Sequence, residues 1–230
     1  MKSIEEVLGK IIIKRNKRSK SFNMRVKEGV FHLSVPFYAS DDVIRQVLQD
    51  NIEPLLNLKE KYPYFIIDSK FAIESDEYSF SILCEKSVCT SLKSNGKDFL
   101  LLLQSEFDFN DDSSQQWLRK VIENTIVNRA KVVLPRMLKK LAVELQLEYS
   151  RVSINRAKTK WGSCSNRKSI NISCYTLLLP YDLRRYILLH ELAHLTHLNH
   201  SPDFWTLLNT YTDGQVTTLE KQLKNYKRPF

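Results

Sequence analysis

The sequence predicts an α+β fold in two parts: a β-rich part over residues 1–110 with one helix, and a part over residues 111–230 built around a long kinked helix. Apolar and polar residues alternate in two short runs within residues 11–35, and strand-like runs return within residues 64–110. Over residues 112–145 and 182–198 the apolar residues recur at helical spacing instead. A chain of 230 residues can form two small domains, and residue 110 is the expected boundary.

The composition predicts a soluble cytoplasmic protein with a real core. Hydrophobic residues make up 43% and charged residues 27%, which excludes a globally disordered chain. The longest apolar runs, such as residues 99–103, are far shorter than the roughly 20 residues that a membrane span needs, so no membrane partner is expected. The N-terminus lacks the layout of a signal peptide. No pair of the four cysteines has the spacing of a zinc knuckle or redox motif, so free thiols are expected.

The net charge of +9 favours polyanionic partners such as nucleotides or nucleic acid, although a solvated basic face without a partner is the alternative. Basic residues gather within residues 10–27 and 119–168, and an acid-leaning stretch over residues 74–112 separates them.

The N-terminal part is expected to begin with short strands and then form a helix. Alternating residues flank a turn at Glu28-Gly29: Met24, Val26, Phe31, Leu33 and Val35. Ser40 is a typical N-cap, and helical spacing continues from there to Leu56. Strand-like runs follow at residues 64–67, 78–84 and 99–104, and Asn95-Gly96 predicts a hairpin turn before the last run.

The C-terminal part is expected to open with the longest helix, which starts at residues 111–113 and carries one apolar stripe to Leu145. Pro135 interrupts that stripe, so a kink or two abutting helices are expected. Short strands are expected around residues 152–154 and 170–172. Two helices should follow, at residues 182–198 and 203–211.

Residues 190–194 read His-Glu-Leu-Ala-His, the H-E-x-x-H pattern of zinc peptidases. Four residues turn a helix through about 400°, so His190 and His194 project from one face about 6 Å apart and can bind one metal ion. Glu191 can reach a water in the open coordination position and accept its proton as general base.

A third ligand is expected because catalytic zinc sites usually have three protein ligands. His197 lies about 10.5 Å along the helix from His190, too far for one ion. His200 becomes available if the helix ends first, and Asn199 with the nearby Pro202 can end it. The prediction is therefore His200, with His197 outside the coordination sphere or facing solvent.

The segment from Lys158 to Cys164 reads Lys-Thr-Lys-Trp-Gly-Ser-Cys. It can be a turn in which Trp161 anchors the core. Alternatively, Lys158 and Lys160 bind a carboxylate or phosphate of the substrate. Phe204 and Trp205 are expected to pack behind the metal-binding helix.

Together these segments closely resemble the YgjP-like metallopeptidase family, a zincin-like family similar to SprT-like and WLM-type proteases. The resemblance rests on residues 158–165, 170–172, 190–195, 199–201 and 204–205, and the stretch from Asn16 to Pro36 is also similar. It is loose over residues 64–110, where the glycines usual in the family are missing. Metzincins place a glycine between the second and third metal ligands, but His197 stands at that position here. No methionine follows Met137, so the Met-turn of metzincins is also absent and membership of that group is excluded.

The resemblance implies a zincin-like fold with a small sheet beside the active-site helix. It also implies a single zinc ion held by His190, His194 and His200, with Glu191 as the catalytic acid and base. The strand from Ile170 to Cys174 would be the edge along which an extended peptide adds. The residues expected to contact the substrate are Lys158, Lys160, Trp161, Ser163 and Ile172.

Three functions are compatible with these residues. The first is a zinc metallopeptidase that acts on peptides or proteins. The second is a metal-dependent nucleoside triphosphate pyrophosphatase at the same site, because some relatives carry that label with UTP as substrate and Lys158 and Lys160 could clamp phosphates. The third is a nucleic-acid-associated binding module with structural zinc. A purely structural site would not need the Glu191 carboxylate beside an open coordination position.

Overall fold

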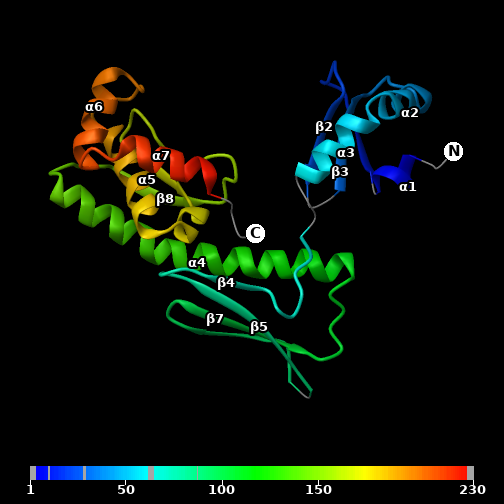
Figure 1. Cartoon of the computed structure of the whole chain (residues 1–230), viewed down its shortest axis with the longest axis horizontal. Coiled ribbons are helices and arrows are strands. Elements are labelled where there is room, and N and C mark those ends of the chain that lie inside the picture. The colour runs from blue at the N-terminus through cyan, green and yellow to red at the C-terminus, as the bar shows by residue number, and fades with distance from the viewer. Residues whose placement is uncertain (1–3, 10, 28–29, 62–64, 87, 227–230) are drawn as a thin grey trace. The chain divides into compact units, whose positions relative to one another are not determined.

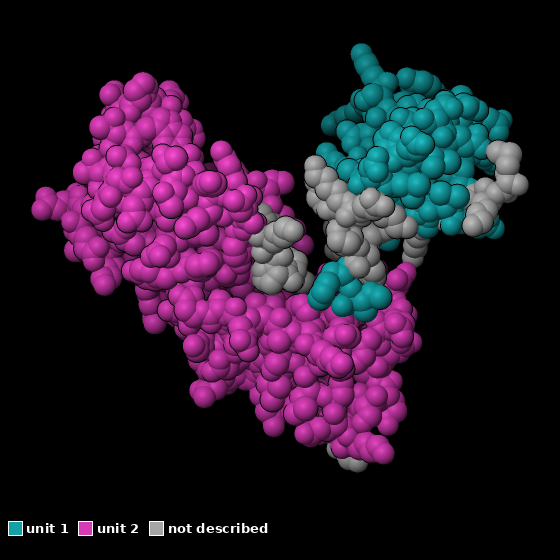
Figure 2. All heavy atoms as spheres, in the orientation of Figure 1, with its two compact units in different colours: residues 1–66 teal, residues 67–230 magenta. Residues whose placement is uncertain are grey.

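The computed structural model describes residues 4–9, 11–27, 30–61, 65–86 and 88–226. The chain divides into two compact units, residues 1–66 and residues 67–230, which Figure 2 colours separately. The turn expected at Glu28-Gly29 lies outside the described residues. None of the described helices is long and apolar enough to cross a membrane.

The first unit is a three-stranded sheet with helices on one face (Figure 1). Its elements are α1 (Ile4–Leu8), β1 (Ile11–Asn16), β2 (Asn23–Lys27), β3 (Val30–Pro36), α2 (Asp41–Asp50) and α3 (Ile52–Lys61). The strand order is β1-β3-β2, with β1 parallel and β2 antiparallel to the central β3. Alternate β3 residues are buried against the helices, so the other face of the sheet is open to solvent.

The helix expected from Ser40 to Leu56 forms as two helices. The Ser40 hydroxyl accepts a hydrogen bond from the Val43 amide at 3.4 Å, which confirms the N-cap. Asn51 then leaves the helical conformation, and its side-chain amide donates to the Val47 carbonyl at 2.8 Å. This local hydrogen bond ends α2 one residue before α3 begins, as asparagine commonly does at helix ends.

The second unit begins with a four-stranded sheet. Its strands are β4 (Ala72–Glu74), β5 (Ser79–Glu85), β6 (Ser91–Asn95) and β7 (Asp98–Gln104), in the order β4-β5-β7-β6. The Asn95-Gly96 turn is confirmed, and Gly96 has the positive φ of 65° that such turns require. The prediction of a strand at residues 64–67 is wrong for residues 65–67, the part that the structure describes. The Gln115 side chain takes the place of a neighbouring strand there, since it accepts from the Ile67 amide and donates to the Ile67 carbonyl.

The helix α4 (Asp112–Glu144) connects this sheet to the rest of the unit. It continues through Pro135 as one element of 33 residues, so two abutting helices do not form. Side chains of β5, β7 and α4 belong to one buried cluster, and the Tyr78 hydroxyl is hydrogen-bonded to Thr125 at 2.8 Å. The expected boundary at residue 110 falls between β7 and α4, inside this shared core, whereas the compact unit begins at Ile67.

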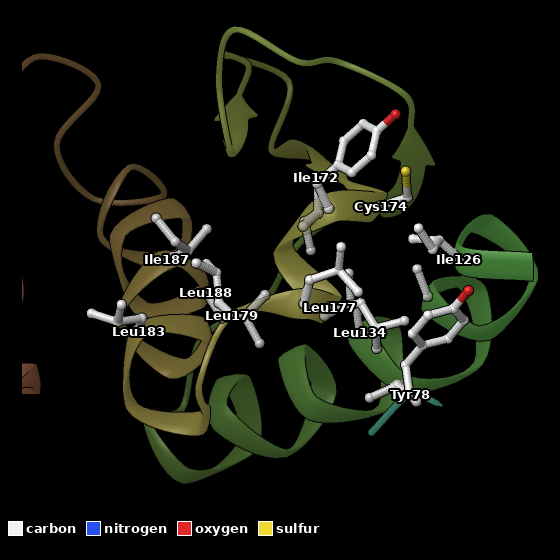
Figure 3. Packing of buried hydrophobic residues seen from close by; sticks show 14 of the residues in the cluster. Tyr78, Ile126, Leu134, Ile172, Cys174, Leu177, Leu179, Leu183, Ile187 and Leu188 are labelled. Atoms are coloured by element: carbon white, nitrogen blue, oxygen red, sulfur yellow. The ribbon is translucent and has the colours of Figure 1, made fainter. Parts of the chain in front are cut away.

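The remaining elements carry the histidine-rich segment of the chain, and three of them, β8, η1 and α5, pack directly against α4. They are β8 (Arg151–Asn155), β9 (Gly162–Cys164), β10 (Ser169–Ser173), the 3₁₀ helix η1 (Cys174–Leu178), α5 (Tyr181–Ala193), α6 (Pro202–Tyr211) and α7 (Val216–Asn225). Figure 3 shows η1 residues such as Leu177 lying between α4 and α5. The helix α7, whose Val216 and Leu219 are buried, was not predicted from the sequence. The α+β class is confirmed.

The small sheet lies beside α5, but its order is β8-β10-β9. The central strand β10 pairs with parallel β8 on one side and antiparallel β9 on the other. The expectation that residues 170–174 form a free edge is therefore wrong. The three residues of β9 form the edge strand on the side of α5, and Gly162 of β9 lies against Glu191 of that helix.

Candidate metal centre

The turn after α5 returns the chain to the histidines. The helix ends at Ala193, with His194 as its C-cap, rather than at Leu198 as expected. Asn199, which was expected to help end the helix, lies beyond that end and does not have the positive φ of a left-handed residue. Ser201 instead caps α6 through a hydrogen bond from the Phe204 amide, and Pro202 occupies the start of that helix. The early end of α5 leaves room for His200 to return to it.

Three imidazoles converge at this turn. One ligand atom from each of His190, His194 and His200 lies within 4.8 Å of the other two. The Nε2 atoms of His190 and His200 are 3.0 Å apart. The structure thus brings together the three residues expected to bind a metal, and no fourth histidine, cysteine or carboxylate joins the group among the described residues.

A backbone carbonyl fixes the tautomer of one imidazole. Nδ1 of His194 lies 3.0 Å from the carbonyl oxygen of His197. A carbonyl can only accept, so Nδ1 carries the proton and Nε2 keeps its lone pair for a metal. His197 therefore contributes its main chain to the site, and its side chain stays outside the cluster. Such hydrogen bonds orient metal-binding histidines in proteins.

Aromatic rings support the cluster from α6. Phe204 is fully buried and stacks on His194 with ring centroids 4.6 Å apart. Trp205 stacks on His200 at 5.5 Å. These contacts agree with the expected packing of both residues behind the metal-binding helix. They restrict the imidazole rings and exclude water from one side of the site.

Glu191 is buried beside the histidines without a polar partner on one oxygen. Its side chain is 5% exposed, and its Oε2 atom has no hydrogen-bond partner among the described residues. Burial raises the pKa of Glu191 to about 8, and the nearby Lys160 ammonium opposes that rise. Burying a carboxylate this way is costly unless a positive charge or a hydrogen-bond donor completes its surroundings.

Gly162 of β9 makes this burial possible. A Cβ atom at position 162 would lie 2.6 Å from Cδ and 2.7 Å from Cγ of Glu191, closer than real side chains approach. Burial and the Glu191 charge raise the pKa of the Cys164 thiol, so this thiol also lies on the side of Glu191. From the sequence, Gly162 was expected only as part of a turn. No spacing rule links it to a helix about thirty residues later.

The other residues expected to contact substrate lie in different surroundings. Lys160 interacts with Glu191, whereas the Lys158 ammonium lies over the Tyr175 ring at 5.6 Å. The Trp161 carbonyl accepts hydrogen bonds from Ser173 and Thr176. Strand alternation points Ser163 away from Glu191. Ile172 is fully buried in the central strand, so its expected contact with substrate is wrong.

The donor set fits a metal ion. Burial, together with the neighbouring His194 and His200, lowers the pKa of His190 to about 4, and burial also lowers the pKa of His194. Neutral imidazoles with converging lone pairs are the form in which histidine binds zinc and related transition metals. A cation here would also compensate the buried carboxylate of Glu191.

Comparison with known proteins identifies the family. A family model described as YgjP-like, metallopeptidase domain, matches residues 20–226, which include most of both units. Two solved structures match part of the chain with TM-scores of 0.36. The zymogen of Pyrococcus abyssi abylysin is 25% identical and the match covers 40% of this chain and 91% of that one. The zymogen of Methanocaldococcus jannaschii jannalysin is 24% identical, and the match covers 40% of this chain and 93% of that one. The search of curated proteins found no match.

Proposed function

The chain belongs to the YgjP-like metallopeptidase family, and from that premise we propose that it is a zinc-dependent peptidase with Glu191 as its general base. The observation that carries this proposal is the juxtaposition of three converging imidazoles with a buried carboxylate that lacks a partner on one oxygen. His190, His194 and His200 would hold the ion. Zinc bound there would polarise the scissile carbonyl and lower the pKa of water to about 7.

The residues of this chain would manage the proton. Glu191 in its ionised form would accept a proton from the attacking water as the new C–O bond forms. The protonated acid would then donate to the leaving amine nitrogen as the C–N bond breaks. The Lys160 ammonium favours the ionised form of Glu191 because it lowers the pKa that burial raises. Proton acceptance and donation by one residue need no further titrating group.

The edge strand β9 is the proposed place for the substrate. It pairs only with β10 among the described strands, so its outer backbone groups are available to an extended peptide. The same strand carries Gly162 against Glu191, which would bring a peptide paired with β9 close to the general base. This replaces the strand from Ile170 to Cys174 as the expected docking edge.

The other two functions receive less support from the site. A phosphate clamp needs both lysines of the Lys158-Thr-Lys160 segment, yet only Lys160 interacts with Glu191 while Lys158 covers the Tyr175 ring. A structural zinc site normally has four protein ligands, and the described residues offer a group of three. Three ligands leave a position for water or substrate, as in catalytic zinc sites.

Metal removal tests the proposal. Purified protein should cleave an unstructured protein such as casein, lose that activity after treatment with a chelator, and regain it when one zinc ion per chain is restored. Circular dichroism of the metal-free protein is the control for unfolding. Cleavage that continues at the original rate in protein shown to contain no metal would contradict the proposal.

Substituting Gly162 with alanine is expected to lower the rate of peptide hydrolysis about 100-fold, the loss that a shift of about 1 Å in a catalytic group can cause. The new Cβ would overlap the side chain of Glu191 and force it to move. Zinc content should stay unchanged because the histidines are not displaced. Ser153→Ala is the matched control, since Ser153 is exposed on β8, the opposite edge strand of the same sheet. Equal activity in the two variants would show that Gly162 does not position Glu191.

A further inference from the structure

The open face of the sheet in the first unit forms a hollow of about 480 Å³. Its lining comes from all three strands and from the loop between β1 and β2. The lining residues are Ile12, Lys14, Asn16, Ser19, Ser21, Asn23, Arg25, His32, Leu33 and Ser34. We call this surface the basic hollow. It lies within residues 1–66, so it is separate from the histidine cluster in the second unit.

Strand register explains why these residues share one face. Ile12 and Arg25 both pair with His32 of the central strand, from opposite sides. Lys14 and Asn23 pair in the same way with Ser34. Paired residues point to the same side of a sheet, so these two rows lie next to each other on the open face. Lys14 and Arg25 thus lie on the two outer strands, with β3 between them.

The chemistry of the basic hollow suits an anion. Lys14 and Arg25 are exposed, and neither forms an ion pair with a described residue. Arg15, the neighbour of Lys14, points to the other face, where it pairs with Asp41 and bonds to the Ala39 carbonyl. The remaining polar lining consists of serine hydroxyls, asparagine amides and one imidazole, all of which can donate hydrogen bonds, and no lining residue is acidic.

The surrounding sequence extends this charge. Residues 10–36 contain eight lysines and arginines but a single acidic residue, Glu28. The basic residues are Lys10, Lys14, Arg15, Lys17, Arg18, Lys20, Arg25 and Lys27. Residues 37–66 contain three basic and five acidic residues, so the positive charge of the unit is concentrated on the sheet and its loop. A field of one sign over a concave surface attracts polyanions.

We propose that the basic hollow binds the phosphate backbone of a nucleic-acid duplex without reading its sequence. Phosphate oxygens are commonly bound by lysine and arginine together with serine and asparagine side chains, which is the composition of this lining. The lining contains no phenylalanine, tyrosine or tryptophan on which unpaired bases could stack. Proteins that prefer single strands usually provide such rings.

Binding of a fluorescein-labelled 20-base-pair DNA duplex of mixed sequence by the full chain tests the proposal, with fluorescence anisotropy measured from 50 to 200 mM KCl. The wild type should bind the duplex and lose affinity as salt rises. A Lys14→Gln, Arg25→Gln double variant should bind more weakly, and its affinity should fall about tenfold less over this salt range. The reason is that two fewer phosphate contacts release fewer counterions.

A Lys93→Gln, Lys131→Gln variant is the matched control, because it removes the same charge from exposed sites in the second unit. It should keep the salt dependence of the wild type. If the glutamine variant fails to fold, a Lys14→Arg, Arg25→Lys double variant takes its place in the test. This variant keeps both positive charges and should keep duplex binding. The proposal is overturned if the wild type does not bind the duplex at 50 mM KCl. It is also overturned if the control weakens binding equally, or if a single strand of the same length binds more tightly.

Discussion

Substituting Glu191 with glutamine is expected to lower the rate of peptide hydrolysis about 10³-fold, within the range attributed to general acid–base catalysis. Glutamine has nearly the same shape, so it should fit the buried space beside Gly162. Its amide cannot accept the proton of the attacking water. The measurement is the initial rate of cleavage of an unstructured protein by equal amounts of wild-type and variant protein.

The zinc content of each preparation is the control for this comparison. Glu191 does not belong to the histidine cluster, so the variant should bind as much zinc as the wild type. Loss of activity together with full zinc content would identify a catalytic role. If the Glu191→Gln protein binds zinc and cleaves at the wild-type rate, Glu191 is not the general base.

The second large effect is expected at His200. Its substitution by alanine removes one of three ligands and should weaken zinc binding by more than roughly 100-fold, the upper end of the loss caused by removing a partner outside the coordination sphere. His197→Ala is the matched control from the same turn. His197 contributes its backbone carbonyl to His194, and that carbonyl remains in the alanine variant.

Competition with a chromophoric chelator measures both variants under identical conditions. His197→Ala should retain wild-type zinc affinity and most of the activity. His200→Ala should lose both. If His197→Ala loses zinc while His200→Ala retains it, His197 is the third ligand, and the selection of His200 is incorrect.

The histidines proposed as ligands could be predicted from the sequence because their arrangement depends on local spacing. Two histidines four residues apart on a helix share a face wherever the helix lies, which the structure bears out for the positions of His190 and His194. The position of His200 depended on where α5 ends. Its end at Ala193 was not predicted, and the turn that follows this end holds the His197 carbonyl against Nδ1 of His194.

The surroundings of Glu191 could not be predicted, because they depend on contacts between distant segments. Gly162 meets Glu191 across the interface between β9 and α5, and no local pattern reveals this contact. The order of the strands in the sheet could not be predicted for the same reason. An apolar strand such as residues 170–172 can be central or at an edge, and only its pairing with both β8 and β9 shows that it is central. Ile172 was therefore expected to contact substrate although it is buried.

Elements with strong local signals were predicted well. The Ser40 cap, the Asn95-Gly96 turn and the long amphipathic helix all form near their expected positions. Elements whose state depends on tertiary partners were not. The backbone amide and carbonyl of Ile67 are hydrogen-bonded to the Gln115 side chain instead of to a neighbouring strand. The division of the chain at residue 66 follows from the shared core of the β4–β7 sheet and α4, which composition along the chain does not reveal.

The most direct test of the proposed activity offers two kinds of substrate to the same zinc-loaded protein. Casein and a panel of nucleoside triphosphates including UTP are incubated in parallel, with Glu191→Gln as the control in each. Mass spectrometry detects new peptide termini, and a coupled assay detects pyrophosphate or phosphate. We expect the wild type to produce new peptide termini and the variant to produce none. Release of pyrophosphate or phosphate from nucleotides should be no faster with the wild type than with the variant. Pyrophosphate release that depends on Glu191, with intact casein, would contradict the assignment as a peptidase.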